Sequence, residues 1–300
     1  MNLKNAETFV WAATLGSFTA AADRLGATQP AISARIAALE DELGVKLFDR
    51  TGRRMQLTPA GLDLLPRAER YVALAAEIKA AVGDRNALTG LVRLGTSETL
   101  VHDWIPELIR QVHADYPGVS LELYVDLSVN LREQLVAREL DIAFLLGPVS
   151  EPSMINRALC AYEMAWVAGP AMILPPRRLT LEAMAKVPIV TFLRQTRPHL
   201  QIRQALSRPD LPTPRISGSS SVATMIRMAE DGVGLAAVPL DIVRPQIEDG
   251  RLRLVDTDLP LASLAFTSTW PASPPNPLAQ LVGHLADNAA KVRRSTVAAG

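Results

Sequence analysis

A single long helical pattern, running from Pro59 to Leu88, most constrains how this 300-residue chain can fold. Apolar residues recur in it at alternating steps of four and three residues, close to the a/d seam of a coiled coil. If the helix continues to Ala87, it spans on the order of 40 Å at 1.5 Å per residue. Residues 1–58 alone are too few to bury the whole stripe. Its members are Leu64, Ala68, Tyr71, Ala75, Ile78 and Val82.

The stripe predicts that this helix pairs with a second copy of the chain. The alternative is that it packs against the C-terminal part of its own chain. Either way the helix separates two regions of different texture, and we expect three parts. These are residues 1–58, a linker and dimerisation helix at 59–89, and residues 90–300.

The composition excludes binding to nucleic acid or to anionic membranes by bulk positive charge. There are 31 Lys plus Arg and 31 Asp plus Glu, so the formal net charge is zero. A small local basic patch remains compatible with that balance. With 48% apolar and 21% charged residues, the chain can build sizeable cores and is not typical of a disordered protein. At roughly 100–200 residues per domain, its length predicts about two domains.

Compartment and metal content also follow from simple counts. A single cysteine, Cys160, cannot form an intrachain disulfide, which suits a reducing cytosol. The four histidines show no ligand spacing, so we expect no metal site. We find no secretory signal pattern and no apolar run near the ~20 residues that span a bilayer. The expectation is a cytoplasmic protein with no membrane partner.

Residues 1–58 contain short helical patterns separated by turn signals. One helix ends at Gly26, and Thr28 is a candidate N-cap for the next, with Pro30 in its first turn. Two short helices joined in this way form a helix-turn-helix, in which the N-terminal residues of the second helix meet base edges. The alternative is an ordinary corner between two core helices. The candidate DNA contacts on the second helix are Thr28, Gln29, Pro30, Ser33 and Arg35.

A predicted β-hairpin around Gly52 follows these helices. Its tip carries arginines, which can reach phosphates or a narrow minor groove. A charged tip alone is usually a solvated turn, but beside an exposed recognition helix it favours DNA contact. These arginines are Arg50, Arg53 and Arg54.

From Leu91 onward, β-like runs alternate with amphipathic helical stretches, which indicates an α/β fold. In open α/β sheets, ligands bind beyond the carboxyl ends of the strands, and helix N-termini there favour anions. Polar or glycine residues follow three predicted strands, although each alone is more often a helix cap. The candidates for effector binding are Ser97, Glu98, Thr99, Ser128 and Gly147.

The chain then crosses into a second subdomain near Ala161 and returns around Ser263 to Thr269. We expect lobe I at 90–161 and 268–300 and lobe II at 162–267. The second wall of the cleft between them is predicted to include Thr191, Phe192, Arg194 and Ser220.

The effector's chemistry stays open at this point. Arg194 could grip a carboxylate, or it could be a solvated loop charge. Glu98 would repel a carboxylate unless it is paired or turned away, and it could instead accept hydrogen bonds from a hydroxyl or an amine.

No catalytic motif stands out, and we expect no enzyme and no catalytic residue. The segment Gly232 to Ala237 superficially matches a dinucleotide-binding fingerprint, but its strand follows the glycines instead of preceding them. No P-loop, nucleophile elbow or metal-binding helix motif is present.

The N-terminal residues resemble the LysR-type transcriptional regulators. The matching segments are Phe18-Thr19-Ala20-Ala21-Ala22, Thr28-Gln29-Pro30-Ala31-Ile32-Ser33, Leu39-Glu40, Leu43-Gly44-Val45-Lys46-Leu47-Phe48-Asp49-Arg50 and Leu57-Thr58-Pro59-Ala60-Gly61. Further matches in the second region are Leu94-Gly95-Thr96-Ser97, Trp104-Ile105-Pro106-Glu107-Leu108, Tyr116-Pro117-Gly118-Val119, Leu140-Asp141-Ile142-Ala143 and Gly232-Val233-Gly234-Leu235-Ala236-Ala237-Val238-Pro239.

This resemblance implies an α+β winged helix-turn-helix DNA-binding domain, a long linker helix and a two-lobed α/β effector domain like the periplasmic binding proteins. It implies base reading by Gln29, Pro30 and Ser33, and a phosphate or minor-groove contact from Arg53. Many family members carry a basic or polar residue where this chain has Ala34.

The expected function is DNA-binding transcription regulation, modulated by a small anionic or aromatic metabolite in the interlobe cleft. Expected partners are double-stranded promoter DNA with a pseudo-palindromic site, further copies of the chain as a dimer or tetramer, and a small-molecule co-inducer. RNA polymerase is considered as a further partner, and no cofactor is expected. The alternative is a metabolite-binding or metabolic protein whose N-terminal helices serve only assembly.

Overall fold

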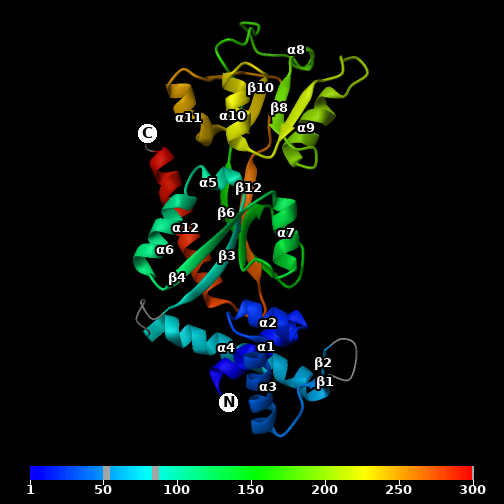
Figure 1. Ribbon diagram of the computed structural model, residues 1–300. Helices are drawn as coiled ribbons and strands as arrows, with labels where there is room; N and C mark the ends of the chain where they lie inside the picture. The colour runs from blue at the N-terminus through cyan, green and yellow to red at the C-terminus, as the bar shows by residue number, and fades with distance from the viewer. Residues whose placement is uncertain (50–54, 83–87, 299–300) are drawn as a thin grey trace.

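The computed structural model describes residues 1–49, 55–82 and 88–298. Three parts follow one another along a single axis (Figure 1). A small helical part, here called the head, lies at one end, lobe I lies in the middle and lobe II at the other end. The predicted fold class, a helix-turn-helix domain followed by two α/β lobes, is confirmed.

Three helices and a two-stranded sheet form the head. Ser17 and Thr28 cap the second and third helices through their side-chain oxygens, and Gly26 between them adopts the left-handed φ of 57° that the tight turn requires. Ile32 and Ile36 on the third helix are fully buried, as their spacing predicts. The elements are α1 (Leu3–Leu15), α2 (Phe18–Arg24), α3 (Gln29–Leu43), β1 (Phe48–Asp49) and β2 (Gln56–Leu57).

A buried carboxylate, Glu40, ties the end of α3 to the strand that follows. It accepts hydrogen bonds from the backbone N–H of Leu47 at 2.9 Å and of Phe48 at 3.3 Å, and from Lys46 Nζ at 3.0 Å. Burial acts to raise the pKa of Glu40, but the hydrogen bonds from Leu47, Lys46 and Phe48 outweigh it and hold the pKa below its usual value. The charged form therefore stabilises the head.

The long helix α4 (Pro59–Val82) divides its apolar stripe between two environments. Its first half packs on the head, where Ala68 is fully buried and Leu64 half-buried. Farther along, Leu74 and Ile78 are each 55% exposed. The head therefore covers only the first half of the stripe. No helix among the described residues is long and apolar enough to cross a membrane.

Lobe I is a five-stranded mixed sheet in the order β4-β3-β5-β12-β6. Strands β3, β4 and β5 are parallel, whereas β12 runs antiparallel to β5 and β6. Helices α6 and α12 pack on one another, and α7 lies across the sheet from them (Figure 1). The elements are β3 (Gly90–Thr96), α5 (Glu98–Val101), α6 (Ile105–Asp115), β4 (Val119–Val125), α7 (Ser128–Val136), β5 (Ile142–Leu146), β6 (Met154–Tyr162), β12 (Leu264–Pro271) and α12 (Pro277–Ala298).

Lobe II repeats this plan with a sheet in the order β11-β7-β10-β8-β9. Strands β10, β8 and β9 are parallel, and β7 is antiparallel to β10. The elements are β7 (Met164–Ala168), α8 (Leu181–Lys186), β8 (Ile189–Phe192), α9 (Arg197–Leu206), β9 (Ile216–Ser219), α10 (Val222–Glu230), β10 (Leu235–Pro239), α11 (Leu240–Glu248) and β11 (Arg253–Leu254).

The lobe boundaries differ slightly from those predicted. Strand β12 pairs with β6 from Leu264, opposite Tyr162, so residues 162 and 264–267 belong to the sheet of lobe I and not to lobe II. Strand β6 was not predicted, because Asn156 and Arg157 interrupt its apolar pattern. Two helices, not one, follow β3, because Pro106 begins α6 in its first turn.

We expect Glu40→Gln to lower the free energy of unfolding of the head by about 1–3 kcal/mol at pH 7, because a buried charged hydrogen-bond acceptor is lost. The folded pKa of Glu40 lies below the unfolded one, so its contribution is present above the unfolded pKa and is lost as pH falls through the folded pKa. Urea titrations read out by hydrogen exchange of the α3 amides measure the difference. The exposed neighbour variant Asp41→Asn is the control. A deficit that is equally large at pH 3 and pH 7 contradicts this account.

Candidate nucleic-acid interface and effector site

The N-terminal turn of α3 presents an open polar surface. Thr28 accepts a hydrogen bond from Ala31 N at 3.4 Å, and Pro30 lies in the first turn, where no N–H is needed. Thr28, Gln29 and Pro30 are all exposed. Gln29 Nε2 lies 3.4 Å from Ser33 Oγ, which it contacts as a donor. The two side chains predicted to read bases therefore lie together.

The structure does not bring Arg35 to this surface. Its guanidinium points toward α1, where Nη1 lies 3.5 Å from Thr8 Oγ1. The remaining predicted DNA contacts, Arg50, Arg53 and Arg54, lie outside the described residues. The strands that flank them do pair, with Phe48 opposite Leu57.

The head docks on lobe I through a buried ion pair that the sequence did not suggest. Arg24, the last residue of α2, binds Asp141 with both terminal nitrogens, and Nη1 lies 3.0 Å from Oδ2. The two side chains are only 9% and 2% exposed. Burial, reinforced by Arg93, lowers the pKa of Arg24 to about 10, so it remains a cation at neutral pH. The ring of Trp11 lies 4.4 Å from the guanidinium.

Asp141 has two further donors. The backbone N–H of Arg93 donates to Oδ2 at 2.8 Å, and Asn276 Nδ2 donates to Oδ1 at 2.8 Å. Beside this pair a cavity of about 640 Å³ separates the head from lobe I. A second polar contact joins Ser273 to Glu69 on α4. The direct contacts across the junction are thus polar, whereas apolar side chains such as Trp11, Leu91 and Leu278 line the cavity beside them.

The predicted effector residues of lobe I converge at the carboxyl ends of β3 and β5. Ser97 Oγ and Ser128 Oγ lie 3.3 Å apart, and Ser128 Oγ accepts a hydrogen bond from Leu146 N at 2.9 Å. Gly147 follows, with its carbonyl bound by Thr267 Oγ1 at 2.7 Å. Thr99 is buried within the lobe.

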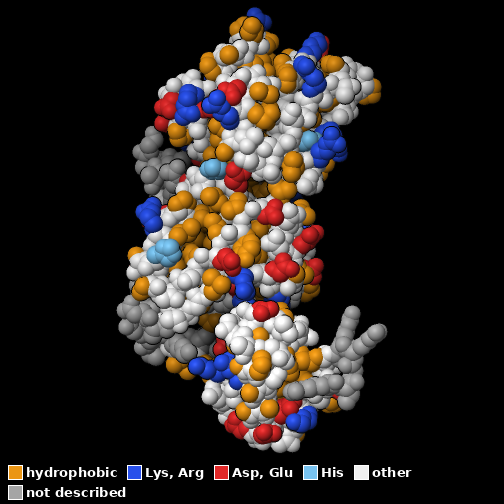
Figure 2. Space-filling view, in the orientation of Figure 1, with side chains coloured by type: hydrophobic (Ala, Val, Ile, Leu, Met, Phe, Trp, Pro, Cys, Tyr) orange, Lys and Arg blue, Asp and Glu red, His pale blue; other side chains and the backbone are white. Residues whose placement is uncertain are grey.

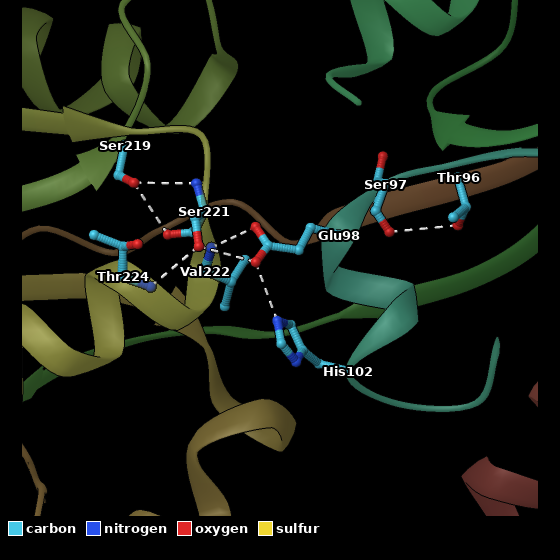
Figure 3. A network of polar contacts seen from close by, with 8 residues as sticks. All are labelled: Thr96, Ser97, Glu98, His102, Ser219, Ser221, Val222 and Thr224. Carbon is cyan, nitrogen blue, oxygen red and sulfur yellow. Dashed lines mark hydrogen bonds and ion pairs between the residues drawn. The ribbon is translucent and has the colours of Figure 1, made fainter. Parts of the chain in front are cut away.

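Glu98 reaches across to lobe II. Figure 3 shows its carboxylate directed from the start of α5 to the start of α10, where it accepts hydrogen bonds from Ser221 Oγ at 3.0 Å and Val222 N at 2.7 Å. His102 Nε2 lies 3.2 Å from the same carboxylate. Because a helix N-terminus carries partial positive charge, the contact is electrostatically favourable. One carboxylate thus bridges the two lobes.

None of the four residues predicted for the lobe II wall bonds to Glu98. Ser221, not Ser220, meets Glu98, and Ser220 and Arg194 are exposed. Thr191 is fully buried, and Phe192 packs in the core and accepts a hydrogen bond at its carbonyl. Residues on successive strand positions face opposite sides, so both cannot line one wall.

Sequence reasoning could have found Ser221. It precedes an amphipathic helix and caps it, accepting a hydrogen bond from Thr224 N at 3.2 Å. His102 carried a weaker signal, since it lies four residues after Glu98, the spacing at which side chains meet on a helix. Within the described parts of the chain, no three His, Cys, Asp or Glu side chains gather as metal ligands would.

Comparison with known proteins agrees with this architecture. Residues 3–62 match the family described as "Bacterial regulatory helix-turn-helix protein, lysR family", and residues 85–290 match "LysR substrate binding domain". The regulator YeiE of Escherichia coli is 29% identical over 261 residues, which cover 87% of this chain and 88% of YeiE. The regulator GltR of Bacillus subtilis is 26% identical over 253 residues, 84% of each chain.

Solved structures show the same fold. A full-length OxyR from Pseudomonas aeruginosa has a TM-score of 0.60 at 24% identity, over 96% of this chain and 94% of that chain. Full-length LysG from Corynebacterium glutamicum, solved with bound effector Arg, has a TM-score of 0.60 at 21% identity, over 97% and 98%. These relatives are transcriptional regulators and not enzymes. The two family matches together span nearly all of the described residues, and the chain belongs to the LysR family of transcriptional regulators.

Proposed function

We propose that this LysR-type regulator reads a pseudo-palindromic promoter site as a dimer or tetramer and responds to a small anionic metabolite bound between its lobes. One observation carries the proposal: an exposed polar turn on a recognition helix lies in the same chain as a carboxylate that bridges two lobes. The alternative is that the N-terminal helices only mediate assembly. The match of residues 3–62 to a family of regulatory helix-turn-helix proteins gives it no support. We also propose that the regulator acts in the cytoplasm and that RNA polymerase is a further partner.

Pairing through α4 is supported by its uncovered stripe. Tyr71 and Ile78 of the stripe are exposed, and so is Leu74, which lies beside the stripe on the same face. A second copy of α4 would bury this face and would place two recognition helices on one face of the duplex.

An anionic effector is supported by the start of α10, which already holds a carboxylate, that of Glu98. An incoming carboxylate would compete with Glu98 for Ser221 Oγ and Val222 N, and Ser97 and Ser128 lie at the neighbouring strand ends. Binding that favours one lobe arrangement would bias the assembly and the bend of the DNA through linkage. Because a carboxylate, that of Glu98, already binds at this helix start, a charged effector that could replace it is better supported than an uncharged aromatic one.

Replacing both base-reading candidates, Gln29→Ala with Ser33→Ala, is expected to abolish sequence preference. Each lost base contact removes about 1–3 kcal/mol of discrimination. Duplexes selected from a random pool with the wild-type chain, and then titrated with the variant, measure the loss. The matched control, Gln204→Ala with Ser207→Ala, changes exposed residues of lobe II. Selective binding that survives in the first variant contradicts the proposed reading surface.

Charged residues on this uncovered face, Leu74→Glu with Ile78→Glu, are expected to shift the chain toward monomers, because burying each carboxylate in a seam is costly. Sedimentation velocity across a concentration series measures the change. Leu62→Glu, exposed on a different face of α4, is the control. If the double variant self-associates as the wild type does, α4 is not the dimer contact.

For the effector site, we expect Glu98→Gln to strengthen binding of a carboxylate effector about tenfold or more. It removes a like charge and a competitor whose charged hydrogen bonds are worth about 1.5–3 kcal/mol. A thermal-shift screen of small organic acids and aromatic metabolites against the full chain supplies the ligands, and calorimetry supplies the affinities.

Glu107→Gln, on the exposed surface of α6, controls for the loss of one charge. If every carboxylate hit binds the two variants equally, the effector does not compete with Glu98. If the hits are amines whose binding is lost in Glu98→Gln, the effector pairs with Glu98 instead.

A further inference from the structure

Arg24 is buried although it ends a short helix at the surface of the head. The fold of the head does not require it, because the core of the head is built from other residues. It is buried because lobe I covers it and Asp141 binds its guanidinium. Trp11 holds the guanidinium from the side of the head, at 4.4 Å from the ring centroid. A head separated from lobe I would therefore present an oriented, exposed cation.

We propose that Arg24 is a DNA-phosphate contact of the head, and that Asp141 binds its guanidinium in place of a phosphate when DNA is absent. A guanidinium binds carboxylates and phosphates with the same two-pronged geometry, so one can replace the other. Asp141 binds Arg24 in this way, through Nη1 and Nη2.

The position of Arg24 fits a phosphate contact. In a helix-turn-helix the first helix crosses the DNA backbone while the second enters the major groove. Arg24 ends that first helix and lies four positions before Thr28, the N-cap of the recognition helix. Phosphates flank the groove that Gln29 would enter, within reach of a long side chain from α2.

Lobe I and DNA cannot both occupy this side of the head. Gly26, in the turn between α2 and α3, lines the same cavity as Leu91 and Arg93 of lobe I. A duplex reaching the end of α2 would fill space that lobe I takes. Glu139, exposed two residues before Asp141, would also repel phosphates, and Figure 2 shows further acidic side chains on the visible face of lobe I. Docking and DNA binding therefore compete for Arg24.

The junction is built to separate. The apolar cores of the head and of lobe I are separate clusters among the described residues. A cavity of about 640 Å³ lies between them, so undocking breaks the polar contacts, exposes the apolar side chains that line the cavity and leaves each core as its own cluster. Phosphates can replace those contacts for Arg24, whereas Asp141 retains the N–H of Arg93 and the amide of Asn276.

The test compares Arg24→Met with Asp141→Asn in the full chain, using a fluorescent random-sequence duplex over a range of salt concentrations. A phosphate contact weakens binding on every sequence alike, so this test does not depend on the proposed base reading or on the effector. We expect Arg24→Met to bind severalfold more weakly, with a log–log salt slope shallower by about 0.9. We expect Asp141→Asn to bind severalfold more tightly, because it frees Arg24.

The opposite signs are decisive. If the pair only held the head in place, both substitutions would release it and shift affinity in the same direction, and that result overturns the proposal. The double variant should behave as Arg24→Met does. Arg110→Met and Asp210→Asn, both exposed and far from the junction, are the matched charge controls. A wild-type chain that binds no duplex at low salt contradicts DNA binding itself, and the proposal with it.

A distance measurement covers the case in which Asp141→Asn fails to fold. Spin labels at Asp23→Cys and Glu139→Cys, in a Cys160→Ser background and diluted with unlabelled chain, report the separation of head and lobe I. We expect the distance to increase when the duplex is added. An unchanged distance in the DNA-bound chain overturns the proposal.

Discussion

The carboxylate of Asp141 brings together segments that lie far apart in the sequence. An isolated charge at 2% exposure would be strongly unfavourable, and here donors from α2, from β3 and from the loop before α12 compensate it. The position of the head relative to the sheets depends on this balance. Since Asp141 immediately precedes β5, whose far end is held by Ser128, the same strand runs from the head to the residues proposed to bind the effector.

The two junctions of the molecule differ in kind. Between the lobes, an apolar cluster is continuous from Leu94 and Phe144 to Phe192 and Val222, with Glu98 added at its edge. Between the head and lobe I, a few polar contacts lie beside a cavity lined by apolar and charged side chains. Burial of apolar surface resists separation over its whole area, whereas an ion pair can be exchanged for another. The effector domain is therefore the stiffer unit, and the head is the part that can move.

Much of this architecture was predictable because it rests on local patterns. The caps at Thr28 and Gly44 and the helical spacing of Ile32 and Ile36 determine α3, and strand ends followed by serines place Ser97 and Ser128 together. What could not be predicted depends on partners distant in sequence. The Arg24–Asp141 contact joins residues 117 positions apart, and Ser221 was separable from Ser220 only by its capping role. No periodicity encodes which of two serines meets a carboxylate from another lobe.

Helix α4 is continuous, and the head covers only the first half of its apolar stripe, so the helix connects its covered and its exposed half rigidly. Ala68 is embedded in the head and Ile78 is exposed, so if α4 pairs as proposed, no joint lies between the head and the dimer contact. The rotation about the helix axis from Ala68 to Ile78 is therefore set by the number of residues between them alone. Each residue of an α-helix advances 1.5 Å and turns about 100°. A single insertion between these positions would leave both contacts intact and yet point the two recognition helices at different faces of the duplex.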